Sequence, residues 1–192
     1  MVTISKFSSD NQSFNHLLKR RSSIPEEVET TVREVLKDVK TRGDEALYEY
    51  MKKFDHADMT EIGLFVTEAE FADAKEKVTD DYTVSVNRAC DNLFKLHKKQ
   101  LPASFSETYE DDAVLERRYT PINSLAINVP GNMAPLVSTL YMNVIPAIVA
   151  GVPNIYILTK PRIDGTIDEH LLYVADYLNI RNYYKISGSQ GL

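Results

Sequence analysis

The chain has 192 residues, of which 43% are hydrophobic and 26% charged, and its formal net charge is −6. These values are typical of a globular protein with a hydrophobic core and leave room for one domain or two small ones. The acidic balance and the short, scattered basic clusters argue against nucleic acid as a partner, and no apolar run approaches the ~18 residues of a membrane span.

The single cysteine, Cys90, excludes a disulfide within the chain. Cys90 lies at helical spacing from Val86 and Leu93, which predicts a small buried apolar residue rather than a nucleophile. The N-terminus lacks the apolar core of a secretory signal, so we expect a cytoplasmic protein without membrane contact.

The first 112 residues are charged and follow helical patterns. An apolar face at three-to-four spacing predicts a helix over residues 26–39, formed by Val28, Val32, Val35 and Val39. Gly43 can end this helix, and Asp44 can cap a second one. Thr67 and Glu70 form a capping-box pattern that predicts a third helix through about residue 78.

A longer helix is expected over residues 80–100. His97 extends its apolar face, and we interpret it as a packing or hydrogen-bonded residue because no second metal ligand lies at helical spacing. The polar and acidic residues 101–112 predict a loop.

The periodicity changes near residue 113. We expect an exposed strand over 114–119, buried strands over 125–129, 155–158 and 183–186, and helices over 136–150 and 168–178. The helix over 136–150 is apolar nearly all round, which predicts burial on several sides, and Pro146 should kink or break it.

Alternating strands and helices indicate parallel pairing with right-handed crossovers. The predicted fold class is therefore α/β. A mainly helical N-terminal region (residues 1–112) would precede a partial Rossmann-like α/β domain (residues 113–192).

The segment from Asn128 to Pro135 follows a buried strand and precedes a helix, and open α/β sheets bind their ligands at such strand ends. It lacks the Gly-x-Gly-x-x-Gly pattern of a dinucleotide loop. On the residues alone, a structural turn at Pro130-Gly131-Asn132 is favoured over a nucleotide site.

Five segments, in order, carry a resemblance to one enzyme family. They are Thr41–Leu47 with Lys53-Phe54-Asp55; Asn92–Gln100; Pro121–Met142; Ile145–Val152; and Gly188-Ser189-Gln190. Together they resemble the histidinol dehydrogenases from about residue 24 onward.

The resemblance implies a cytoplasmic, zinc-dependent homodimer that oxidises L-histidinol with NAD to L-histidine, the last step of histidine biosynthesis. It places NAD contacts at Asn128, where the family has Tyr, and at Pro130, Gly131 and Gln190. Asn132 stands where the family has a second glycine, and an asparagine tolerates the positive φ of such a turn.

The family's zinc ligands and its catalytic Glu-His pair lie in a part of the enzyme that this chain does not match. No residue here is therefore assigned as catalytic or as a metal ligand, and none of His16, His56, His97 and His170 fits a family zinc ligand. Three hypotheses follow. In the first, the chain is the N-terminal portion of a histidinol dehydrogenase or of a close alcohol dehydrogenase relative, and the rest is lost or is encoded in a complementary C-terminal chain. In the second, it is a non-catalytic homologue that acts as a binding or dimerisation module. In the third, it is an unrelated α/β ligand-binding domain whose resemblance to the family is accidental.

Overall fold

The computed structural model describes residues 25–130 and 134–191. Its helical elements are α2 (Glu26–Arg42), α3 (Asp44–Tyr50), a π-helical turn η1 (Met51–Asp55), α4 (Glu68–Lys77), α5 (Asp80–Lys98), α6 (Val137–Ala150), α7 (Glu169–Tyr177) and a 3-10 turn η2 (Ser189–Gly191). Its strands are β1 (Phe105–Thr108), β2 (Val114–Arg117), β3 (Ser124–Val129), β4 (Asn154–Thr159) and β5 (Tyr183–Tyr184).

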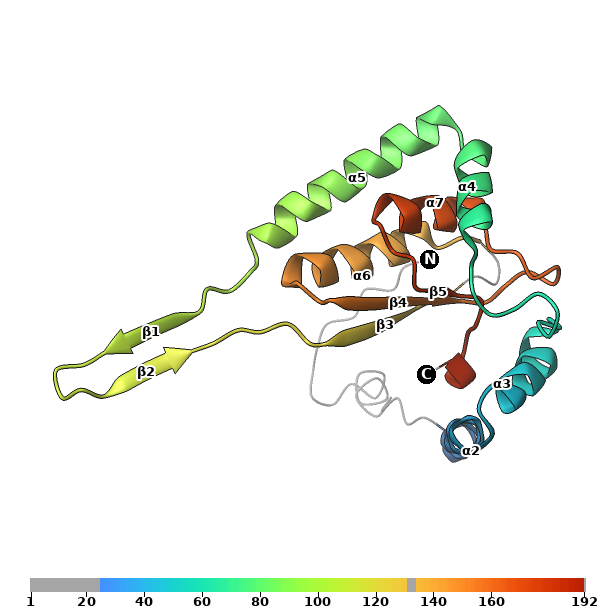
Figure 1. Ribbon diagram of the computed structural model, residues 1–192, viewed down its shortest axis with the longest axis horizontal. Helices are drawn as coiled ribbons and strands as arrows, with labels where there is room; N and C mark the ends of the chain where they lie inside the picture. Colours follow the sequence, from blue (N-terminus) through green and yellow to red (C-terminus); the bar gives the residue numbers. More distant parts are fainter. Residues whose placement is uncertain (1–24, 131–133, 192) are drawn as a thin grey trace, which may run out of the picture.

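The central feature is a parallel sheet with the strand order β3-β4-β5. Helix α6 connects β3 to β4, and helix α7 connects β4 to β5. Helices α4 to α7 lie on one side of this sheet, and α2 and α3 lie on the other (Figure 1). The predicted α/β class, with a helical N-terminal region and a partial Rossmann-like sheet, is confirmed, whereas the division near residue 113 stays a prediction.

Strand alternation explains how the sheet packs. Ile127 and Val129 of β3 are buried in the main core, while Ala126 and Asn128, which alternate with them, are exposed on the opposite face. The strand predicted as buried over residues 125–129 is therefore buried on one face only. The main core includes residues of α4 and α5 as well as of the sheet, so the helical region and the strands share one hydrophobic cluster. Cys90 is buried in it, as predicted, and burial raises the pKa of its thiol to about 11.

The capping box predicted at Thr67 is present. The Thr67 hydroxyl accepts a hydrogen bond from the Glu70 backbone N–H, and the Glu70 carboxylate accepts one from the Thr67 N–H at 2.9 Å. Glu70 also pairs with the buried Lys185 at 2.7 Å. Burial alone would raise the pKa of Glu70, but the hydrogen bonds from Lys185 and Thr67 outweigh it, and the pKa lies below its usual range.

The structure corrects three further sequence predictions about local structure. The segment predicted as a loop contains strand β1, which pairs antiparallel with β2 and leaves every residue of both strands exposed. Strand β1 has no apolar pattern in its own sequence, and only its pairing with β2 defines it as a strand. Pro146 was predicted to kink or break this helix. Helix α6 continues through Pro146, so the break is wrong, whereas the kink stays a prediction. Buried residues lie on both sides of the proline in the sequence.

The helix predicted over residues 26–39 is confirmed as α2, in which only Val35 of the apolar face is buried and Val28 is 49% exposed. The third correction concerns the next helix. Asp44 lies within the first turn of α3 instead of capping it, because Gly43 takes the N-cap position without a side-chain bond.

The β1–β2 hairpin projects away from the rest of the molecule (Figure 1). Within the described residues, no helix combines the length and apolar character needed to cross a bilayer.

Candidate functional site

A buried carboxylate stands at the carboxyl end of the parallel sheet. Asp55 is only 6% exposed. Its Oδ1 lies 3.1 Å from the Lys160 ammonium and accepts a hydrogen bond from the Ser187 hydroxyl at 3.3 Å, while its Oδ2 accepts one from the Gln190 amide nitrogen at 3.1 Å. Because an isolated buried charge is strongly unfavourable, these partners are what permit a carboxylate here.

Two local features bring Asp55 to the sheet. It is the last residue of the π-helical turn η1, a geometry that occurs frequently at functional sites. The next residue, His56, has a left-handed backbone with φ of 57°, which turns the chain sharply away from the helix. The carboxylate is therefore presented at the end of the helical region rather than along its side.

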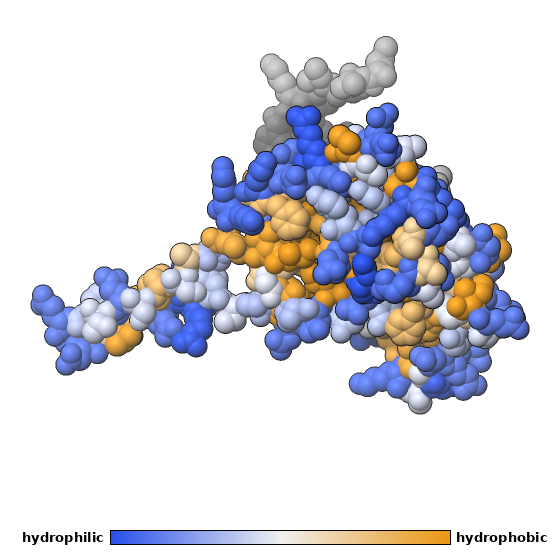
Figure 2. All heavy atoms as spheres, turned by 45° about the horizontal axis from the view of Figure 1, so that its top comes forward, coloured by the Kyte–Doolittle hydropathy of each residue, from blue (hydrophilic) through white to orange (hydrophobic). Residues whose placement is uncertain are grey.

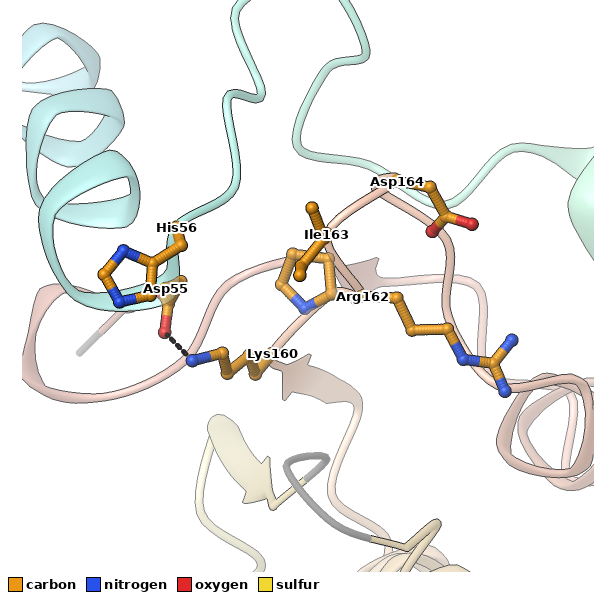
Figure 3. A pocket seen from close by; sticks show the side chains of 7 residues that line it. Asp55, His56, Lys160, Arg162, Ile163 and Asp164 are labelled. Atoms are coloured by element: carbon orange, nitrogen blue, oxygen red, sulfur yellow. Dashed lines mark ion pairs between the residues drawn. The ribbon is translucent and has the colours of Figure 1, made fainter.

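The cationic partner comes from β4. Lys160 directly follows this strand and continues the alternation of Tyr156 and Leu158, which places it on the sheet face opposite helix α6. Its side chain is 24% exposed, so the ammonium is partly open to solvent. Figure 3 shows it reaching toward Asp55.

A cleft of about 680 Å³ opens beside this ion pair and is lined by Asp55, His56, Lys160, Pro161, Arg162, Ile163 and Asp164. Its size falls within the range of ligand sites, roughly 300–1,000 Å³. Its position beyond the end of β4 is the place where open α/β sheets bind ligands. The Asp164 carboxylate accepts bonds from the Thr166 hydroxyl and N–H, and these lower its pKa.

A glycine turn after β5 places Gln190 on Asp55. Gly188 has a φ of 69°, and a Cβ there would lie 2.8 Å from the Gln190 Oε1 atom. The turn thus needs the left-handed freedom of glycine and also the space that its missing side chain leaves.

The four residues assigned by resemblance to cofactor binding have different surroundings. Gln190 is 5% exposed and bonded to Asp55. Asn128 is exposed on the sheet face opposite α6 and is paired in register with Leu158. Pro130 is exposed just beyond β3, and Gly131 lies outside the described residues.

Among the described histidines, His56 and His97 belong to no group of three potential metal ligands. The His97 Nδ1–H donates a hydrogen bond to the Gln100 Oε1 atom at 2.8 Å, in agreement with the predicted hydrogen-bonded role. Among the described residues, one group of three potential ligands lies within 4.8 Å: Asp168, Glu169 and His170.

The carboxylates of this group already have partners. Asp168 caps α7 by accepting the His170 N–H bond, and Arg162 pairs with Asp168 at 2.6 Å and with Glu169 at 3.5 Å. A guanidinium occupies the position that a cation would take, so these residues do not fit the zinc that the family implies.

Sequence reasoning did not assign Asp55 or Lys160 to the site. Lys53-Phe54-Asp55 enters only as a motif of the resemblance, and Lys160 has no assignment between the strand predicted over 155–158 and the helix predicted over 168–178. A usable signal was present, because a lysine directly after a buried strand lies at the ligand-binding edge of a parallel sheet.

A parallel βαβαβ sheet with a polar cleft beyond its carboxyl ends defines the class of α/β ligand-binding proteins. Comparisons of the chain with known proteins identify one family within this class. A family model described as "Histidinol dehydrogenase" matches residues 18–192. A histidinol dehydrogenase of Symbiobacterium thermophilum is 38% identical over 94% of this chain and 42% of the relative, and one of Nitratidesulfovibrio vulgaris is 40% identical over 85% of this chain and 38% of the relative.

The fold agrees with these matches. The crystal structure of histidinol dehydrogenase from Elizabethkingia anophelis superimposes with a TM-score of 0.84 at 33% identity, covering 93% of this chain and 41% of that one. The chain belongs to the histidinol dehydrogenase family. It spans about two-fifths of the length of the relatives it matches.

Replacing Asp55 tests whether the buried ion pair organises the site. Asp55→Ala leaves Lys160 without its counter-charge. We therefore expect the free energy of unfolding, measured in urea, to fall by about 2 kcal/mol. This fall is smaller than is usual for a broken buried pair because the Lys160 side chain is partly exposed. Asp73→Ala is the matched control, since its partner Lys77 is exposed, and it should unfold close to the parent. Equal stability of the two variants would contradict the role of Asp55.

Gly188→Ala tests the turn. We expect it to cost about 1 kcal/mol more than Gly63→Ala, because both positions have positive φ but only Gly188 has a crowding neighbour. The excess should disappear in a Gln190→Ala background, where the crowded amide is gone. Urea unfolding of the four variants and the parent measures this, and an excess that persists without the amide would show that Gln190 is not the cause.

Proposed function

We propose that this chain supplies the dinucleotide-binding part of a histidinol dehydrogenase, the enzyme that oxidises L-histidinol to L-histidine with NAD. The observation that carries the proposal is the place of Gln190. The residue that the resemblance assigns to NAD lies at the carboxyl ends of the strands, in one hydrogen-bonded group with Asp55 and Lys160. A cleft of ligand size adjoins that group.

The residues present suit a dinucleotide in three respects. Lys160 and Arg162 offer N–H donors to phosphate or ribose oxygens. Asp55 fixes the Gln190 side chain, so this amide is held in one orientation. Asn128 lies on the same sheet face as Lys160 and can donate or accept through its exposed amide.

NAD supplies a hydride acceptor when it is bound. The part of the reaction left to this chain is to bind and orient that molecule. The zinc site and the acid-base groups would come from polypeptide beyond the two-fifths that the chain spans, such as a complementary chain.

The proposal is tested by titrating the 192-residue chain with NAD in a calorimeter. Gln190→Ala should weaken NAD binding about tenfold, which is the effect expected from the loss of one hydrogen-bonding side chain. The control variant Gln100→Ala should leave NAD binding unchanged, because Gln100 lies at the end of α5. Circular dichroism checks that both variants fold. Absence of any NAD binding by the folded parent would overturn the proposal.

A second candidate function, an association module, is favoured by a separate observation. Helix α6 carries no charged residue, yet Met142 is 56% exposed on it, and Leu96 of the neighbouring α5 is 49% exposed. Figure 2 shows hydrophobic atoms gathered on the body beside the base of the hairpin. Among the described strands, β3 is paired only with β4, so its other edge is open to a further strand.

Light scattering after size exclusion tests this candidate. We expect a dimer of the parent chain that Met142→Lys converts to monomer, because a charge on an apolar contact is costly to desolvate. Val84→Lys is the control, since Val84 is 68% exposed near the start of α5. A parent that is monomeric at every concentration would contradict self-association and leave a complementary chain as the partner to seek.

A further inference from the structure

The β1–β2 hairpin is exposed along its whole length. Every residue of both strands is exposed, and the hairpin projects away from the sheet and its helices (Figure 1). An isolated two-stranded hairpin is only marginally stable in water and gains stability by packing against another surface. One face of this hairpin is suited to packing, because the strand register places Phe105 and Leu115, which are 45% and 52% exposed, on the same side.

The far end of the hairpin is strongly acidic. Residues 107–112, called here the acidic tip, have the sequence Glu-Thr-Tyr-Glu-Asp-Asp, with four carboxylates and no cation. The turn is closed by its own hydrogen bonds. The Tyr109 carbonyl accepts the Asp112 N–H at 3.0 Å, and the Asp111 carboxylate accepts the Ala113 N–H at 3.2 Å. Because like charges gathered on one turn repel one another, a cationic surface placed against the tip would be stabilising.

A cationic surface lies at the end of α5. Lys95, Lys98 and Lys99 are all exposed there, and residues 95–99 contain no carboxylate. Lysines are favourable at a helix C-terminus on their own, so their presence alone defines no site. A second feature accompanies them, because exposed apolar residues lie in the same helix end and in the segments that join the hairpin to the body: Leu96, Leu101 and Ile122. Figure 2 shows hydrophobic atoms on the body at this place.

The acidic tip and these lysines are held apart within one chain. Hydrogen bonds of 2.9 Å close the hairpin at both ends, from the Tyr109 N–H to the Ala113 carbonyl and from the Tyr119 N–H to the Ser104 hydroxyl. The extended run from Ser104 to Tyr109 spans about 17 Å, which is about two Debye lengths at physiological salt. In the part of the chain that the structure describes, no ion pair involves residues 95–99 or 107–112.

We propose that the hairpin is a dimerisation arm whose acidic tip lies on the α5 lysines of a second copy of this chain, while the second copy's tip lies on the lysines of the first. A second copy fits because both complementary surfaces belong to the same chain, and a two-fold arrangement makes each contact twice. The two hairpins then run antiparallel, which brings the apolar face of each toward the apolar base of the other.

This inference rests on the second candidate function, association, and assigns its contact surface. Light scattering after size exclusion of two charge variants of the 192-residue chain tests it. The helix variant, Lys95→Glu/Lys98→Glu/Lys99→Glu, makes the end of α5 acidic. The tip variant, Glu107→Lys/Glu110→Lys/Asp112→Asn, removes the negative charge of the tip. It keeps Asp111, which accepts the Ala113 N–H, and asparagine at position 112 tolerates the left-handed φ of 64°.

Each variant alone should weaken the parent dimer by on the order of a hundredfold, about tenfold for each of two contacts that become repulsive. Mixed in equal amounts, the two variants should form a dimer again. In the mixture the unchanged tip of the helix variant meets unchanged lysines, and the cationic tip of the tip variant meets the acidic helix end.

The matched control is Lys37→Glu/Lys40→Glu/Lys53→Glu. It changes the net charge by the same amount as the helix variant, at exposed lysines of α2 and η1, and should remain dimeric like the parent. Circular dichroism checks that every variant folds.

Three outcomes are distinguishable. Dissociation of both variants with recovery in their mixture supports the inference, provided that the control stays dimeric. A dimer that survives in either variant, or a mixture that stays monomeric, overturns it and leaves association through another surface standing. A parent chain that is monomeric at every concentration overturns both this inference and self-association, and points to a complementary chain.

Discussion

The rest of the candidate site depends on the buried carboxylate of Asp55. A charge with 6% exposure is tolerated only where partners replace its water, and here those partners come from the ends of two different strands. Lys160 follows β4 and Gln190 lies beyond β5. One carboxylate therefore connects the helical region to the carboxyl ends of two strands. The cleft lies beside this ion pair, where His56 turns the chain away from the helix.

A second pair repeats the arrangement on the next strand. Lys185 directly follows β5, is 3% exposed, and pairs with Glu70 in the first turn of α4. The attraction in such buried pairs is largely offset by desolvation, so apolar packing supplies most of the stability. The two pairs instead hold particular elements together. The Asp55–Lys160 pair holds η1 at the end of β4, and the Glu70–Lys185 pair holds α4 at the end of β5.

Sequence reasoning succeeded where the signal is local. The capping box at Thr67, the apolar periodicity of α5 and the apolar run that predicted β3 each depend on residues a few positions apart. The parallel sheet followed from the order of strands and helices. It failed where the signal is distant. Asp55 meets Ser187 and Gln190 across 132 and 135 positions, a separation that periodicity cannot report. Strand β1 was missed for a related reason, because all four of its residues are exposed and only the partner β2 defines it.

The resemblance assigns Gln190 to a cofactor, whereas the structure ties its amide nitrogen to Asp55. The two roles are compatible on physical grounds, because a side chain held at one end presents its other end in a fixed direction, and such preorganisation lowers the entropy lost on binding. The same carboxylate holds the Lys160 ammonium, so a single group orients polar side chains at two neighbouring strand ends.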